Sequence, residues 1–337
     1  MRGLIDVHSH HYPDSYLDAC KREDSGFTHY YRDDGRLVVL QDGGVALAAP
    51  QPLPPLEHRI ELMDDAGVDV QVISVSAPNL ARFPEDIRIP LTRELNDEFS
   101  ELAAGSNGRL RVFISLPLPA IDAALEELDR ALALPNVVGV VVCSNIDRIN
   151  LDDERFSPVW EELSRRGTTV FCHPTVACCT DGLREYAMAL AMGFMADTMF
   201  AVGRLAYAGT FDRFPGIRWI FTHLGGTIPF VLPRYDNYYK QFPECSENIE
   251  RPPSEIMREL YYDTVTMHGP ALRCALDTLG ARQLVFGTDY PHVPGGIDRF
   301  VKVLDSVGMS DQELEMVGRG NATKLIDLEE APTAGGR

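Results

Sequence analysis

The feature that most constrains this chain is a regular alternation of short apolar segments with longer amphipathic ones. Runs such as VDVQVISVS, VVGVVVC and RWIFTHL are nearly continuously apolar, which is typical of parallel strands covered on both faces. The pattern predicts eight strands, at Leu4–Val7, Val68–Val75, Leu110–Ser115, Val137–Cys143, Thr168–Cys172, Ile217–Thr222, Leu260–Thr264 and Gln283–Phe286. Amphipathic stretches predict helices between most of them, at Pro55–Ala66, Leu91–Ala104, Ala120–Leu134, Pro158–Arg166, Asp197–Phe214, Pro253–Arg258 and Pro270–Leu279.

A strand and helix unit repeated in this way indicates an α/β fold, and specifically a (β/α)8 TIM barrel. A doubly wound open sheet is the alternative. No GxGxxG motif follows the first strand, which weakens a dinucleotide-binding version of that alternative. Because barrels of roughly 250 residues or more often form one domain, we expect a single domain over residues 1–328.

Residues 12–54 do not fit the repeat. They contain the polar turns REDSG and YRDDG and end in the proline-rich APQPLPP. We interpret them as an insertion after strand one that carries a small hairpin and lies over the barrel mouth. Residues 329–337, EEAPTAGGR, have the composition of a disordered tail.

The net charge of −19 argues against a nucleic-acid groove or an anionic membrane surface as partner. No run approaches the roughly 18 apolar residues of a membrane span. Because the net charge is strongly negative, an anionic substrate would need positively charged side chains at its binding site. Seven cysteines without framework spacing indicate reduced thiols and a cytoplasmic protein.

Ionisable residues fall at the predicted carboxyl ends of several strands. His8 and His10 close the first strand, and His173 closes the fifth. His223 closes the sixth strand, and Asp289 closes the eighth. In a barrel, the carboxyl ends of all strands open onto one mouth, where active sites lie. We therefore expect these side chains to meet there although they are far apart in the sequence.

These residue types suit a metal ion. Alternation along a strand points His8 and His10 to the same side, so both imidazoles can reach one ion. Taken singly, each position has an ordinary explanation: an HxH triplet can be solvated, His173 can be structural, and Asp289 can cap a turn. Their convergence predicts one divalent cation held by all four side chains. Three imidazoles and a carboxylate suit Zn²⁺, with Mn²⁺ or Fe²⁺ possible because nitrogen and oxygen ligands discriminate poorly.

His223 is left over from this ligand set. It could be a fifth ligand, but we favour a general acid/base role, since imidazoles exchange protons near neutral pH. Gly225 and Gly226 after it would allow a close backbone approach of substrate, or merely a tight turn. His11 points to the opposite side and is interpreted as a residue that packs in the core or supports the ligands. Of the other histidines, only His268, just after strand seven, remains a further candidate for the site. Solvated or supporting roles are expected for His29, His58 and His292.

The motifs together resemble a known family. HSH after strand one, HP after strand five, HLGG after strand six and GTDYP after strand eight look like the amidohydrolase-2 branch of the amidohydrolase superfamily. Within it the chain is most similar to the α-amino-β-carboxymuconate-ε-semialdehyde, γ-resorcylate and 5-carboxyvanillate decarboxylases. MDDAGVDVQV, AYAGTFDRFP, PRYDN, RPPSE and GNATKLI extend the resemblance over nearly the whole chain.

The resemblance implies a distorted barrel, one divalent metal and non-oxidative decarboxylation. By position, the metal ligands of the family correspond to His8, His10, His173 and Asp289. His223 in HLGG corresponds to the histidine that activates metal-bound water or steers the substrate. Arg234 in VLPRYDN matches an arginine that binds the substrate carboxylate in the neighbouring subunit's site. The resemblance therefore also implies a homodimer.

The chain departs from the family pattern in two places. Strand four ends in VVCSN, without the carbamylated lysine of the superfamily, which fits a mononuclear site. The LAAPQPLPP stretch lacks the insertion arginine of the semialdehyde decarboxylase, and Arg59 lies beyond it. We therefore expect a different acid as substrate.

The expected function is metal-dependent decarboxylation of an aromatic or conjugated, muconate-like carboxylic acid. His223 or Asp289 would supply the proton, and Arg234 the substrate-binding cation. One alternative is a metal-dependent hydrolase of a lactone, amide or C–C bond, because the same ion can activate water. A non-catalytic metal-binding barrel is a second alternative, which is disfavoured because His223 is left without a structural role.

Overall fold

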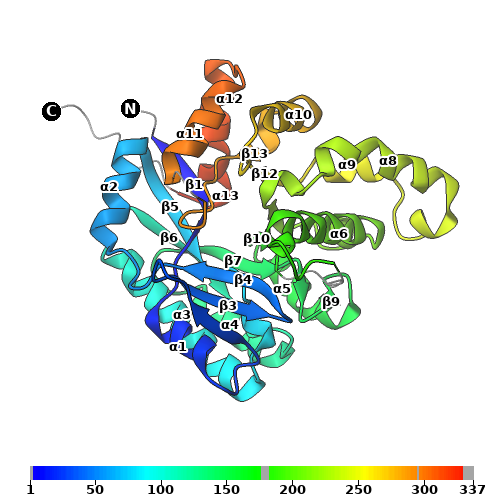
Figure 1. Cartoon of the computed structure of the whole chain (residues 1–337). Coiled ribbons are helices and arrows are strands. Elements are labelled where there is room, and N and C mark those ends of the chain that lie inside the picture. The colour runs from blue at the N-terminus through cyan, green and yellow to red at the C-terminus, as the bar shows by residue number, and fades with distance from the viewer. Residues whose placement is uncertain (1–2, 176–181, 294–295, 329–337) are drawn as a thin grey trace.

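Eight parallel strands form a barrel sheet whose order follows the chain (Figure 1). The computed structural model describes residues 3–175, 182–293 and 296–328. The barrel strands are β1 (Leu4–His10), β5 (Val68–Ser74), β6 (Leu110–Ser115), β7 (Val137–Cys143), β10 (Thr169–His173), β11 (Arg218–Phe221), β12 (Tyr261–Asp263) and β13 (Leu284–Val285). The predicted TIM barrel is confirmed.

The barrel closes where the chain after β13 runs beside β1. The backbone N–H of Val7 donates to the carbonyl of Phe286 at 3.0 Å, and Ser9 forms a parallel bridge with Tyr290. Higher up, the N–H of Asp289 donates to the carbonyl of His8 at 2.8 Å. The closure therefore places Asp289 directly next to the first strand.

Apolar side chains fill the barrel interior below the mouth. They are Ile5, Val7, Val72, Phe113, Val141, Phe171, Ile220 and Val285, all buried. The rings of Phe113 and Phe171 are stacked with centroids 5.2 Å apart. The interior is therefore a packed core that supports the strand ends, and a larger core lies between the strands and the surrounding helices.

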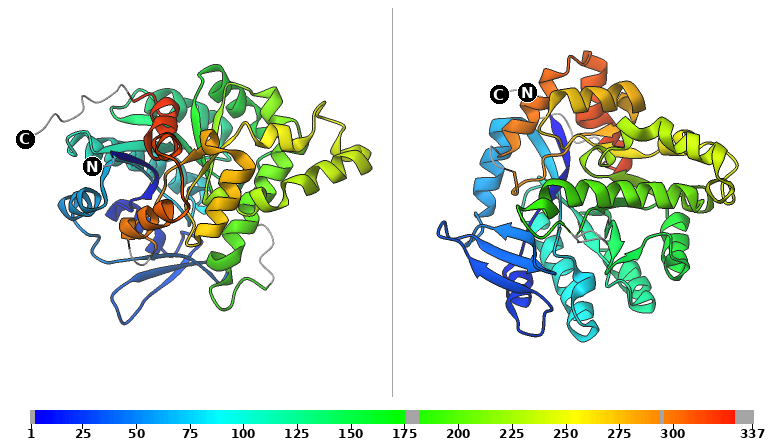
Figure 2. Two further views of the ribbon diagram at one scale, coloured as in Figure 1. Left: turned by 90° about the horizontal axis from the view of Figure 1, so that it is seen from above. Right: turned by 45° about the vertical axis from the view of Figure 1, so that its right-hand side comes forward.

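The main outer helices are α2 (Leu56–Ala66), α3 (Glu85–Ala104), α4 (Ile121–Ala131), α5 (Ser157–Arg165), α6 (Phe194–Tyr207), α8 (Ile228–Gln241), α10 (Gly269–Leu279) and α11 (Gly296–Ser306). The helix predicted at Asp197–Phe214 is split, because Gly209 has φ +71° and separates α6 from the short α7 (Thr210–Arg213). The sequence did not predict α8, which contains prolines in its first turn and its interior. Figures 1 and 2 show α8 extending away from the barrel.

One helical stretch, Ala189–Tyr207, is long and apolar enough to cross a membrane by length and composition alone. Half of it is buried inside the protein, and its last fourteen residues are the barrel helix α6. Core helices of globular proteins have the same properties, so this stretch is weak evidence for a span.

The insertion after β1 contains α1 (Asp14–Lys21) and an antiparallel sheet of β2 (Thr28–Tyr31), β3 (Leu37–Gln41) and β4 (Gly44–Ala49). It lies at one side of the barrel (Figures 1 and 2). The insertion therefore carries a three-stranded sheet where the sequence predicted a small hairpin. The expected tail at 329–337 and the neighbouring Cys178 and Cys179 fall outside the described residues.

Candidate active site

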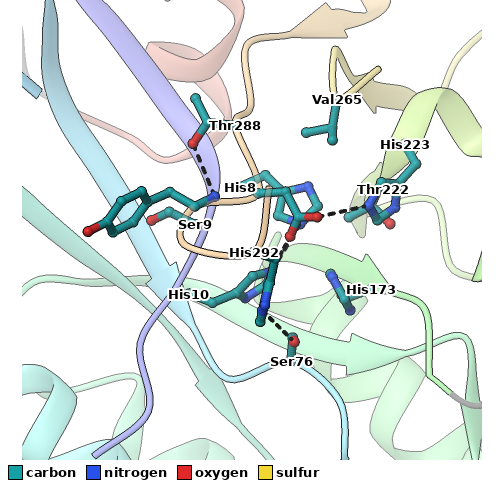
Figure 3. A network of polar contacts seen from close by, with 12 residues as sticks. His8, Ser9, His10, Ser76, His173, Thr222, His223, Val265, Thr288 and His292 are labelled. Atoms are coloured by element: carbon teal, nitrogen blue, oxygen red, sulfur yellow. Dashed lines mark hydrogen bonds and ion pairs between the residues drawn. The ribbon is translucent and has the colours of Figure 1, made fainter. Parts of the chain in front are cut away.

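The four predicted ligands meet at the carboxyl end of the barrel. Figure 3 shows the three histidines among them. His8 and His10 lie in β1, His173 ends β10, and Asp289 follows β13. One ligand atom from each lies within 4.8 Å of the others. The Nε2 atoms of His8 and His10 are 3.0 Å apart, and Oδ1 of Asp289 lies 3.2 and 3.1 Å from them.

The donor set fits a divalent cation. Nε2 of His173 is buried and has no hydrogen-bond partner among the described residues, although buried polar atoms normally have one. The facing Nε2 atoms of His8 and His10 need a proton or a cation between them. In a tetrahedral zinc site with Zn–N distances of about 2.0 Å, ligand atoms lie roughly 3.3 Å apart. The observed separations between His8, His10 and Asp289 are close to this value.

The Nδ1 atom of each imidazole faces an acceptor. That of His8 lies 2.6 Å from Oδ2 of Asp263, that of His10 lies 3.3 Å from the carbonyl of Ser74, and that of His173 lies 2.7 Å from the carbonyl of Pro174. A proton held on Nδ1 leaves Nε2 available to a metal and fixes the ring orientation. Asp263 was not predicted as a site residue, although a carboxylate at the end of a barrel strand was a usable signal.

Burial and charge set the protonation of the ligands. Burial lowers the pKa of His10 to about 3, and it holds the pKa of His173 well below its usual value. Burial opposes ionisation of Asp289, but nearby His8, His10 and His223 outweigh it and hold its pKa well below the usual range. Burial also opposes the charge of His8, yet Asp263 and Asp289 raise its pKa to about 10. His8 is therefore the ligand whose proton a cation would displace.

A buried polar network fixes the two chain segments that carry the ligands. Asp6 accepts hydrogen bonds from the N–H of His8 at 3.0 Å, from the N–H and hydroxyl of Thr288 at 3.1 and 2.6 Å, and from the amide of Gln71 at 2.8 Å. Burial raises the pKa of Asp6 to about 6. This carboxyl ties β1 to the segment that follows β13.

Arg59 supports the same strand end from outside the barrel. Its buried guanidinium donates to the carbonyl of His10 at 2.5 Å and to the side chain of Gln71 at 3.1 Å. It also lies 4.7 Å from the ring centroid of Tyr290. Arg59 therefore positions the backbone of the ligand segments and does not line the cavity above them.

His223 lies beside the ligand group. Its backbone has φ +54°, and its N–H donates to Oδ1 of Asp263 at 2.7 Å. Its Nε2 is 3.5 Å from Oδ2 of Asp289, and its ring lines the cavity. A Cβ at Gly226 would lie 2.2 Å from the carbonyl of Met195. Gly226 therefore permits a tight backbone contact with Met195, and it also lines the cavity.

A cavity of about 870 Å³ lies above the ligands. Much of its lining is apolar, including Leu47 and Phe194, whereas His173, His223 and Asp289 supply polar groups. The turn between β2 and β3 adds Arg32, Asp34 and Arg36 to the lining. The carboxylate of Asp34 lies 3.7 Å from the Nε atom of each arginine. The insertion therefore brings two cationic side chains to the cavity, neither of which was predicted from the sequence.

The other predicted positions lie elsewhere or differ from expectation. Arg234 is exposed on α8, donates to the hydroxyl of Tyr238 at 2.8 Å and does not line this chain's own cavity. His268 is exposed and does not line it either. His292, which was grouped with solvated or supporting histidines, does line the cavity. Its position three residues after Asp289 was the available signal.

Comparison with protein families places the chain. The family model described as amidohydrolase matches residues 5–328. The chain belongs to the amidohydrolase family. This amidohydrolase is 25% identical to 2-amino-3-carboxymuconate-6-semialdehyde decarboxylase of Dictyostelium discoideum, over 96% of the chain and 92% of that protein. It is 28% identical to γ-resorcylate decarboxylase of Rhodococcus jostii strain RHA1, over 80% of the chain and 87% of that protein.

Solved structures share the fold of this amidohydrolase. The apo form of Metarhizium anisopliae IDCase superimposes with a TM-score of 0.85 at 24% identity, covering 96% of this chain and 97% of that one. The 5-carboxyvanillate decarboxylase of Sphingomonas paucimobilis gives a TM-score of 0.84 at 23% identity, covering 98% and 100%. The distorted barrel is thus common to enzymes that share under a quarter of their residues with it.

Proposed function

We propose that this amidohydrolase is a metal-dependent, non-oxidative decarboxylase of an aromatic or conjugated carboxylic acid. The observation that carries the proposal is the group of His8, His10, His173 and Asp289 at the base of a cavity that His223 also lines. The decarboxylases among its relatives support the reaction type.

The cation is Zn²⁺ or Mn²⁺. Imidazole and carboxylate ligands accept both. A dihydroxybenzoic acid decarboxylase from Polaromonas, whose structure contains manganese, shares the fold with a TM-score of 0.80. When bound, the cation supplies Lewis acidity and an anchor for the acid.

His223 and Asp289 act as one proton-transfer unit. With 3.5 Å between Nε2 and Oδ2, a proton can pass between the imidazole and the carboxylate. The unit delivers a proton to the ring carbon that carries the carboxylate. The C–C bond to the carboxylate then breaks, its electron pair restores conjugation, CO₂ leaves, and water reprotonates the unit.

Substrate binding uses cations from two sources. Arg32 and Arg36 line the cavity of their own chain. Arg234 is exposed on the projecting α8 and completes the site of a second copy, so the working form is a homodimer. We further propose that residues 1–328 are one domain in which the insertion at 12–54 covers the barrel mouth. The described cysteines are free thiols, which suits a cytoplasmic enzyme.

The direct test is CO₂ release. The protein loaded with Mn²⁺ or Zn²⁺ is incubated with 2,6-dihydroxybenzoate, 6-methylsalicylate and 5-carboxyvanillate, and in parallel with aromatic lactones. We expect CO₂ from at least one acid, and loss of that activity in His223→Asn with metal content retained. If lactones are hydrolysed and no acid releases CO₂, the proposed decarboxylation is wrong and the protein is a hydrolase.

A further inference from the structure

A second hollow, of about 530 Å³, lies at the amino end of the barrel. Its walls come from the first residues of β6, β7, β10 and β11 and from residues 326–328, which follow α13 (Asn321–Leu325). It shares no lining residue with the cavity above the metal ligands, among the residues that the structure describes. Because those ligands lie at the carboxyl ends of the strands, this amino-end hollow is separate from the candidate active site.

Three arginines line the amino-end hollow. Arg111 lies near the start of β6, Arg166 directly follows α5, and Arg218 begins β11. Within the described part of the lining, Asp327 is the single carboxylate, and it lies 2.8 Å from Nη2 of Arg218. The hollow is therefore cationic in a chain whose net charge is −19.

Arg111 is the arginine without an acidic partner. Its Nη1 donates to the carbonyls of Gly108 and Leu110 at 3.0 and 2.8 Å, and it contacts no carboxylate of the described residues. The side chain is partly buried, which lowers its pKa, and no neighbouring charge opposes this effect. Since buried charges are normally paired, an anion in the hollow would supply the missing counter-charge.

A buried hydroxyl is the second sign of a ligand. Thr168 is 6% exposed and lines the hollow, and its Oγ1 has no hydrogen-bond partner among the described residues. Buried polar atoms normally have such a partner. Because rotation about one side-chain bond moves a threonine hydroxyl, an anion in the hollow can accept a hydrogen bond from it.

We propose that the amino-end hollow binds a phosphate group through Arg111, Arg166, Arg218 and the hydroxyl of Thr168. Guanidinium groups present planar sets of N–H donors that match oxoanions. Phosphate is favoured over carboxylate, because its larger charge and additional acceptor oxygens suit several cationic donors. The volume is in the range of pockets for organic ligands, so the phosphate group can carry a small organic substituent.

The proposal does not depend on the reaction at the other end of the barrel. A ligand that joins residues of β6 and β11 binds the folded chain alone, so it should raise the unfolding temperature as its concentration increases. The role that we assign to it is stabilisation of the barrel by a phosphate compound.

The test is calorimetric titration of the Mn²⁺-loaded full chain, freed of excess metal, at constant ionic strength. The probes are inorganic phosphate and glycerol 3-phosphate, with acetate as the carboxylate for comparison. We expect saturable binding of one phosphate per chain, which persists after a chelator removes the manganese. Tighter binding of glycerol 3-phosphate would identify an organic phosphate as the ligand, and tighter binding of inorganic phosphate would identify the free ion.

Arg111→Gln should weaken phosphate binding about 10-fold or more, as for the loss of a hydrogen bond between charged groups. Arg165 and Arg166 provide a matched pair, because each lies 2.6 Å from Glu162 but Arg166 lines the hollow and Arg165 does not. We expect Arg166→Gln to weaken binding about 3- to 10-fold and Arg165→Gln less than about twofold. Thermal unfolding in chloride buffer shows that each variant folds, and the matched pair decides should Arg111→Gln fail to fold.

Four results would overturn the inference. They are the absence of saturable phosphate binding, binding that disappears with the manganese, acetate binding as tight as that of phosphate, and equal affinities in Arg165→Gln and Arg166→Gln. A folded Arg111→Gln protein with wild-type phosphate affinity would do the same.

Discussion

Nε2 of His8 and Nε2 of His10 lie 3.0 Å apart on the same side of β1, while their Nδ1 atoms are held by different strands. Asp263 at the end of β12 fixes His8, and the carbonyl of Ser74 at the end of β5 fixes His10. The neighbouring strands thus set the separation of two ligands that their own strand merely places on one face. The site is organised by the barrel rather than by a local motif.

The first prediction concerns the carboxylate ligand. Asp289→Ala should remove one of four ligands and with it the charge that the three imidazoles cannot replace. Since loss of a supporting residue alone lowers metal affinity by roughly 10- to 100-fold, we expect a loss above about 100-fold here. Manganese titration and turnover measure it. Asp298→Ala, at an exposed position on α11, is the control. An Asp289→Ala protein that kept both its metal and full turnover would exclude the proposed site.

The second prediction concerns Gly287, whose backbone packs against His8. A Cβ at Gly287 would lie 2.8 Å from Cβ of His8 and 3.3 Å from Cβ of Asp263. Gly287→Ala should displace the His8–Asp263 pair and weaken manganese binding by about 10-fold, within the range seen when ligand support is disturbed. Gly105→Ala is the control, because its nearest new contacts are at 3.6 Å and its φ is −72°. Equal metal affinity in both variants would contradict this.

Much of this site follows from the sequence because the barrel converts strand ends into neighbours. His8, His10, His173 and Asp289 could be grouped without coordinates, since each follows an apolar run and the carboxyl ends share one mouth. The helices were less accessible. No helix was predicted at α8, although Pro229 lies in its first turn, where a missing N–H costs nothing.

The supporting groups could not be found in this way. Arg59 lies in α2 and reaches the carbonyl of His10 only through tertiary packing, so no spacing in the sequence indicates it. Arg32 and Arg36 lie on a polar turn whose sequence is typical of a solvated loop, and only the folded chain shows that they line the cavity. His292 resembled the solvated histidines because its contacts with Tyr12 and Ser76 join residues that are distant in the sequence.

The third prediction concerns pH. The folded-state pKa of His8, about 10, exceeds its usual value of 6.5. Its contribution to the stability of metal-free protein is therefore complete below pH 6.5 and is lost as the pH rises toward 10. Metal must displace the same proton, so metal affinity should increase over the same range. We expect the Tm of chelator-treated protein to fall from pH 7 to pH 10, and the gap to metal-loaded protein to widen.

Asp263→Asn is the matched variant for this titration. The amide can still accept from Nδ1 of His8 but removes a charge that raises the pKa of His8. The pH slope of the metal-free Tm should become shallower, and fewer protons should be released on metal binding, as measured by calorimetry in buffers of different ionisation enthalpy. An unchanged slope in this variant would show that His8 is not the titrating group.

The fourth prediction tests the buried cation outside the barrel. Arg59→Met should leave the carbonyl of His10 and the side chain of Gln71 without their charged donor. We expect a loss of about 2–4 kcal/mol in the free energy of unfolding, measured with urea. Arg59→Lys should recover only part of it, because an ammonium cannot reproduce the planar donor pair. Arg22→Met, at an exposed ion pair, should change stability by less than about 0.5 kcal/mol.

The last prediction concerns Arg234. If it completes the site of a second subunit, Arg234→Ala and His223→Asn should each be inactive alone but complement each other when mixed. Random reassociation makes half of the dimers mixed, and each mixed dimer has one site with both residues intact, so roughly a quarter of wild-type activity should return. A tagged pull-down confirms that mixed dimers form. Inactive mixed dimers would mean that Arg234 and His223 of the same subunit form one site. Full activity of Arg234→Ala alone, or a protein that sediments as an active monomer, would refute the shared site altogether.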